Sequence, residues 1–148
     1  MAFIPCNIGG GSGVTITEDT LWTNQSPSSS FTSTSITLSS PYTDYDYIKI
    51  TFKRHYKDAA NSSYVRRVII PAIANMDVPL VYDTSNNIYH MSYFRNCFLR
   101  DTSAHDTFNI ENTTYERTAA TTVAAVSSGA YYIIPLSIEG IKVTGGEL

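Results

Sequence analysis

Residues 45–53 read Tyr-Asp-Tyr-Ile-Lys-Ile-Thr-Phe-Lys and carry the clearest period-two pattern in the chain. Ile48, Ile50 and Phe52 fall on one face of an extended chain, and the intervening polar side chains fall on the other. A helix would scatter these residues around its circumference. The stretch therefore predicts a β-strand that packs one face on a second layer and presents tyrosine and lysine side chains on the other.

Similar alternation recurs along the chain between Gly-, Ser- and Asn-rich turns. Strands are predicted at residues 14–17, 31–39, 64–70, 88–100, 108–110, 118–126 and 130–143. Residues 88–100 fit either one long strand or two strands broken at Arg95-Asn96. Residues 118–126 fit either a helix or a strand, and the strand is favoured. About seven to nine strands at this spacing predict an all-β fold, an antiparallel two-sheet β-sandwich resembling a jelly roll.

The domain prediction is a flexible N-terminal arm at residues 1–13 and a single sandwich at 14–148. The glycine-rich segment 9–13 lacks the residues of a phosphate loop. Within the sandwich, Leu21 and Trp22 are expected in the core, Val65 and Ile69 are expected to point inward, and Pro71 is expected to interrupt strand pairing. Residues 127–129 are predicted to join the last two strands into a C-terminal hairpin. In its final strand, Tyr132, Ile134, Leu136 and Ile138 are predicted to share one face.

Composition restricts the possible functions. The chain has 148 residues, a formal net charge of -3 and only 16% charged residues. An acidic balance argues against nucleic acid as a partner. The sequence shows no signal peptide or membrane-spanning run, so we expect no membrane insertion. Cys6 and Cys97 are expected to be free, buried thiols.

Enzyme chemistry has weak support in the sequence. His55, His90 and His105 lack metal-ligand spacing, and no Gly-x-Ser-x-Gly elbow is present. Asp101, His105 and Asp106 form the best cluster, but such residues usually just close a turn. Two carboxylates far apart in sequence could meet in the fold to form a glycosidase site, and this is the third-ranked alternative. We therefore predict that the protein is not an enzyme and binds no cofactor or metal.

Three segments resemble, in order, a β-domain of tail-fibre and baseplate-associated proteins of tailed bacteriophages and prophages. They are residues 21–27 (Leu-Trp-Thr-Asn-Gln-Ser-Pro), 45–50 and 138–143 (Ile-Glu-Gly-Ile-Lys-Val). Glu139 departs from the aromatic residue often found there, so packing near Gly140 is expected to differ. The resemblance implies a homotrimeric protein of the virion tail, made in the bacterial cytoplasm, that contacts other tail proteins and a host surface. It carries over no ligand-binding residues.

The sequence leaves two candidate functions, which belong to different classes. The favoured one is host attachment through a bacterial surface polysaccharide, and the alternative is a purely structural tail, baseplate or head-decoration subunit. Eleven tyrosines favour recognition, because tyrosine combines a stacking face with a hydroxyl. Tyr42, Tyr45, Tyr47 and Tyr56 cluster around the opening strand. Carbohydrate binding needs an aromatic platform beside short polar groups, and loop residues supply both. The predicted ligand-binding residues are Tyr56, Asp83, Asn86, Asn87, Asp101, His105 and Asp106.

Overall fold

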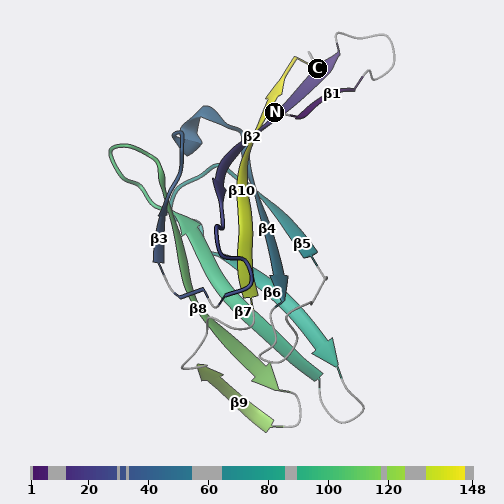
Figure 1. Cartoon of the computed structure of the whole chain (residues 1–148), viewed down its shortest axis with the longest axis vertical. Helices are drawn as coiled ribbons and strands as arrows, with labels where there is room; N and C mark the ends of the chain where they lie inside the picture. Colours follow the sequence, from purple (N-terminus) through teal and green to yellow (C-terminus); the bar gives the residue numbers. More distant parts are fainter. Residues whose placement is uncertain are drawn as a thin grey trace.

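Two antiparallel sheets face each other in the computed structural model, which confirms the predicted all-β sandwich (Figure 1). The structure describes residues 2–6, 13–29, 31–32, 34–54, 65–85, 90–117, 120–125 and 133–145. For β1 and β9, and for parts of β4 and β6–β8, it describes the backbone alone. Five strands form each sheet.

Sheet A contains the strand from which the fold was predicted. Its spatial order is β1 (Ala2–Cys6), β2 (Val14–Thr23), β10 (Ile133–Thr144), β4 (Tyr47–Arg54) and β5 (Val65–Pro71). The first half of β2 pairs with both β1 and the end of β10, and this ribbon extends beyond the body of the sandwich (Figure 1). The segment predicted as an N-terminal arm thus begins with a paired strand.

Sheet B is formed mainly by hairpin neighbours. Its order is β3 (Thr34–Thr37), β8 (Thr107–Arg117), β7 (His90–Leu99) and β6 (Val78–Ser85), and β9 (Ala120–Ala125) pairs with β8. A short 3-10 helix, η1 (Tyr42–Asp44), lies in the connection from β3 to β4. Strand β7 is continuous, with a bulge between Arg95 and Cys97 at the break that the sequence left open.

The core lies between the sheets, and β4 behaves as its pattern predicts. Ile48, Ile50 and Phe52 are buried, and Cys97 is a free buried thiol as expected. Other core side chains come from both sheets: Leu21, Ile36, Leu38, Tyr42, Ile70, Leu80, Tyr93, Leu99, Phe108, Ile110, Ile133 and Ile138. Leu21 lies in β2, whereas Trp22 is half-buried against the core.

The predicted C-terminal hairpin is wrong. Strand β9 belongs to sheet B, whereas β10 crosses to sheet A and lies between β2 and β4. Apolar side chains on both faces suit a central strand, and turn residues alone do not decide which sheet receives it. A bulge between Pro135 and Ser137 also places Ile134 opposite Lys53 but Ile138 opposite Ile50. These two isoleucines therefore lie on different faces, which corrects the predicted single apolar face.

The predicted facing of β5 is also wrong. Val65 and Ile69 are exposed, with 42% and 57% of their surfaces accessible, whereas Ile70 is buried. Pro71 remains in the strand, opposite Tyr47. This position is possible because β5 is an edge strand, where a missing N–H costs no ladder hydrogen bond. Apolar residues of both parities in Val-Arg-Arg-Val-Ile-Ile made the sequence pattern ambiguous.

Candidate functional site

The turn between β7 and β8, residues 100–107, contains three of the predicted ligand residues. The amide of Arg100 donates to the Thr107 carbonyl (2.9 Å), and the His105 amide donates to the Thr102 carbonyl (3.0 Å). His105 adopts a left-handed conformation with φ 51°. Such a φ is uncommon for a residue with a Cβ, so the hydrogen bonds of the turn hold His105 in a sparsely populated backbone conformation.

Tyr42 anchors this turn from η1. Its hydroxyl lies 3.2 Å from the Arg100 carbonyl oxygen and 3.3 Å from Nδ1 of His105. Its backbone amide donates to the His105 carbonyl at 2.8 Å. Burial, together with the negative charge of Asp101, raises the pKa of Tyr42 above its usual value. The phenol therefore remains a neutral hydrogen-bonding group that ties the turn to the core.

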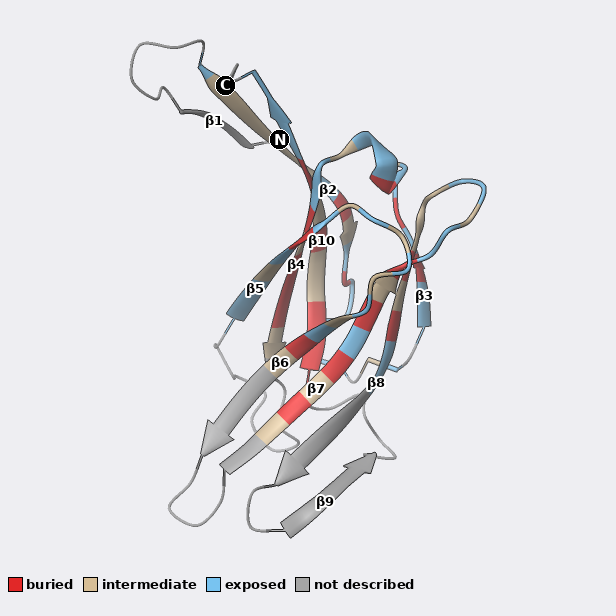
Figure 2. Ribbon diagram, turned by 180° about the vertical axis from the view of Figure 1, so that it is seen from behind, coloured by how far each residue is buried: buried red, intermediate tan, exposed pale blue. Residues whose placement is uncertain are grey.

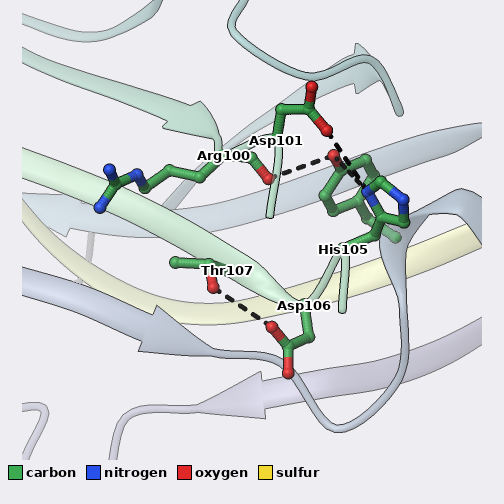
Figure 3. A network of polar contacts seen from close by, with 6 residues as sticks. Arg100, Asp101, His105, Asp106 and Thr107 are labelled. Carbon is green, nitrogen blue, oxygen red and sulfur yellow. Dashed lines mark hydrogen bonds and ion pairs between the residues drawn. The ribbon is translucent and has the colours of Figure 1, made fainter. Parts of the chain in front are cut away.

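The three residues of the predicted cluster, Asp101, His105 and Asp106, do not lie together: Asp101 and His105 are neighbours, and Asp106 is separate from them. Oδ1 of Asp101 lies 3.7 Å from Nδ1 of His105, and both side chains are accessible to solvent. Asp106 instead accepts a hydrogen bond from the Thr107 hydroxyl (3.2 Å) on the other side of the turn (Figure 3). Within the described residues, no group of three or more His, Cys, Asp or Glu side chains is arranged to hold a metal ion.

Of the remaining predicted ligand residues, the structure places only Asp83, which lies away from this turn. Asp83 lies in β6 opposite Ser92, near the start of β7, whereas the turn follows Leu99 at its end. Seven residues of extended strand separate these positions, or roughly 20 Å. Tyr56, Asn86 and Asn87 lie outside the described residues, and only the backbone of Asp83 is described.

The tyrosines around β4 have different environments. Tyr42 is buried, and Tyr45 is half-buried across the end of sheet A. Tyr47 exposes 43% of its surface, and Tyr56 lies outside the described residues. Among the described members of this group, Tyr47 alone therefore presents an exposed ring to a partner.

A second candidate surface is the face of sheet A turned away from sheet B, of which the sequence analysis predicted only the part on β4 with its tyrosine and lysine side chains. We call it the outer face of sheet A. Tyr47, Val65 and Ile69 are exposed large hydrophobic residues on it, and each is placed there by pairing with outward-facing positions of the adjacent strand. Exposed residues, in pale blue, run along β5 at the sheet edge (Figure 2). Neighbouring exposed apolar groups are typical of a contact surface.

Charged residues occupy the centre of the same face. Lys49 of β4 pairs with Glu18 of β2 and lies 3.9 Å from Glu139 of β10. The Ser137 hydroxyl donates to Oε1 of Glu139 at 2.6 Å, whereas Oε2 makes no hydrogen bond within the described structure. This polar group spans three strands and lies beside the exposed Tyr47 and Ile69.

Arg95 is an unusual buried cation inside the sandwich. Its side chain is fully buried; Nε donates to the Glu111 carbonyl (2.6 Å) and Nη1 to the Ile133 carbonyl (2.8 Å). The guanidinium lies 5.2 Å from the ring centroid of Phe31. Burial lowers the pKa of Arg95 to about 10. Because Ile133 belongs to sheet A, this side chain connects the two sheets.

Comparisons with family models, curated proteins and solved structures found no match. Among the described residues, no helix is long and apolar enough to cross a membrane. The residues themselves therefore carry the functional argument. The turn at 100–107 offers a solvent-facing carboxylate and imidazole, and the outer face of sheet A offers apolar and charged groups for a larger partner.

Proposed function

We propose that this protein is a non-enzymatic, homotrimeric component of a phage-like tail that attaches to a bacterial surface polysaccharide. In this proposal the trimer joins other tail proteins and the loops of each copy contact the polysaccharide. Weak binding by one copy is multiplied by avidity across the assembly.

The observation that carries the proposal concerns the three segments on which the resemblance to phage tail proteins rests, residues 21–27, 45–50 and 138–143. These segments lie side by side in the fold. Far apart in sequence, they belong to β2 with its following turn, β4 with its preceding turn, and β10, which are adjacent in sheet A. Asn24 fastens the first to β10: its Nδ2 donates to the Pro135 carbonyl and its amide to the Leu136 carbonyl, both at 2.8 Å. A shared signature made of short, distant pieces is expected when those pieces form one structural unit.

The polysaccharide site is proposed at loop residues, in keeping with the chemistry of sugar recognition. Asp101 and His105 are exposed enough to reach hydroxyl groups of a ligand, and Tyr42 fixes the turn that carries them. We propose a separate contact at Asp83, because β7 separates this residue from the turn. Tyr56, Asn86 and Asn87 stay in the proposal on the ground of their residue chemistry alone.

A structural role without a glycan ligand is the second candidate. The exposed Ile69 and Tyr47 on the outer face of sheet A favour it, because such residues are typical of protein–protein contacts. In this case the protein joins neighbouring virion subunits and has no other ligand.

Binding of the purified protein to an array of bacterial polysaccharides tests the choice. We expect binding by the natural chain, weaker binding by Asp101→Ala with His105→Ala and by Tyr56→Ala with Asn87→Ala, and unchanged binding by the exposed control Glu111→Gln. Absence of polysaccharide binding, together with normal attachment of particles that lack this protein, would overturn the attachment proposal. Binding that neither double variant reduces would overturn the site assignment alone.

A further inference from the structure

The outer face of sheet A has an apolar part that the isolated chain leaves uncovered. Ile69 exposes 57% of its surface and Val65 exposes 42%, although both lie in regular strand. Lys49 and Lys53 are their direct cross-strand neighbours on β4. Removing these apolar side chains from water therefore favours association.

Charge on this face is divided by strand. Among the described side chains of this face, the acidic ones, Glu18 and Glu139, come from β2 and β10. The cationic ones, Lys49, Lys53 and Arg67, come from β4 and β5. Lys49 is held between the two glutamates. One negative charge therefore remains in excess on the β2–β10 side, and Lys53 and Arg67 leave the β4–β5 side positive.

We propose that the outer face of sheet A is a self-association surface, on which the acidic β2–β10 side of one copy packs against the cationic β4–β5 side of a second copy. The proposal rests on the homo-oligomer in the proposed function and specifies its contact surface. The two sides of the face carry opposite charges. The acidic side of each copy therefore attracts the cationic side of the other copy, and the face is complementary to itself.

The position of β5 fits this contact. It is the edge strand of sheet A, and its exposed Ile69 and Val65 lie beside Arg67. Packing against a second copy covers these apolar side chains while the flanking charges set the orientation. The same pairing of sides operates in a two-fold dimer and in a closed ring, so the number of copies is an outcome of the measurement.

Sedimentation of the full chain over the micromolar range at low salt tests the proposal. We expect self-association of the natural protein that weakens as salt rises, because screening reduces exposed charge interactions. Arg67→Glu and Glu18→Arg should each raise the dissociation constant for self-association at least about tenfold. A mixture of the two variants should associate again, because the new Glu at position 67 of one copy then faces the new Arg at position 18 of the other. Ile69→Asn should weaken association at every salt concentration.

Asn96→Glu is the matched control, since Asn96 is an exposed β7 residue between the inward-facing Arg95 and Cys97. Thermal unfolding of each variant establishes that it folds. A monomeric natural chain, or association unchanged by the charge reversals and by Ile69→Asn, would overturn the proposal. Sedimentation measures self-association, whereas the polysaccharide array measures ligand binding. A failed self-association proposal is therefore distinguishable from a failed ligand proposal.

Discussion

The ring of Tyr45 lies directly against the backbone of Gly140. A Cβ atom added to Gly140 would lie 2.5 Å from Cδ1 of Tyr45 and 2.6 Å from Cγ. The Tyr45 hydroxyl reaches Oδ2 of Asp19 in β2 at 3.3 Å, so one side chain spans β10 and β2 from the turn before β4. The sequence resemblance led us to expect altered packing near Gly140; there, glycine admits the ring and Glu139 points to the outer face.

Gly140→Ala is predicted to destabilise the protein by about 1–3 kcal/mol, because the new methyl group overlaps the Tyr45 ring and forces backbone or ring movement. Urea unfolding measures the change. The matched cycle uses Tyr45→Ala, in which the same glycine substitution should cost much less. An equal cost in both backgrounds would mean that the Tyr45 ring is not the obstacle.

Asn24 is predicted to be required for the attachment of the 24–29 turn to β10. It is buried, and its Oδ1 accepts from the Ser26 amide at 2.8 Å while Nδ2 donates to Pro135. Asn24→Ala should lower the free energy of unfolding by about 1–3 kcal/mol because buried polar groups lose their partners. Asn24→Asp should also destabilise, because a carboxylate oxygen then faces the Pro135 carbonyl. Denaturant unfolding of Asn24→Asp near natural stability would contradict this role of Nδ2.

Arg95 is predicted to stabilise the contact between the sheets through its shape and its two carbonyl partners. Arg95→Ala should destabilise by roughly 2–4 kcal/mol, because it leaves a cavity and two unpaired carbonyl groups. Arg95→Met should cost less, since it keeps most of the volume and removes the desolvation cost of a buried charge. Chemical unfolding curves of the two variants give the comparison. If Met were as harmful as Ala, volume would not be the main contribution.

Cys97 is predicted to make stability fall between pH 9 and 10. Burial raises the pKa of the folded thiol to about 12 from the ordinary 9.0, so in this range the unfolded chain loses a proton that the folded chain keeps. The thiol's contribution is fully present below pH 9 and falls by up to about 1.4 kcal/mol per pH unit above it. Cys97→Ser lacks this titration and should show a shallower decline.

Urea unfolding at pH 7, 9 and 10 compares the two chains. The range stops at pH 10 because Arg95, whose pKa is lowered to about 10, acts in the opposite direction above that value. Parallel curves for the natural chain and Cys97→Ser would show that this thiol does not titrate differently on unfolding.

The candidate sites were only partly predictable from the sequence. Local spacing correctly placed Asp101, His105 and Asp106 in one turn, because residues so close along the chain share it. Spacing did not predict that Asp106 turns away or that Tyr42 approaches from η1, since both depend on how the turn packs. On the outer face of sheet A, the sequence predicted the polar side of β4 but missed the contribution of β5. Val65 and Ile69 are apolar, and hydrophobicity alone does not distinguish a core from an uncovered contact surface.

The sequence by itself determined the class of fold. Alternation in β4 put Ile48, Ile50 and Phe52 inside and made a two-layer sandwich the consistent solution, because side chains of a strand alternate between its faces. Tertiary structure alone decided that β10 lies between β2 and β4 and that Ile69 faces outward. Strand order and facing depend on pairing between distant segments and on bulges that shift the register, and local periodicity contains neither.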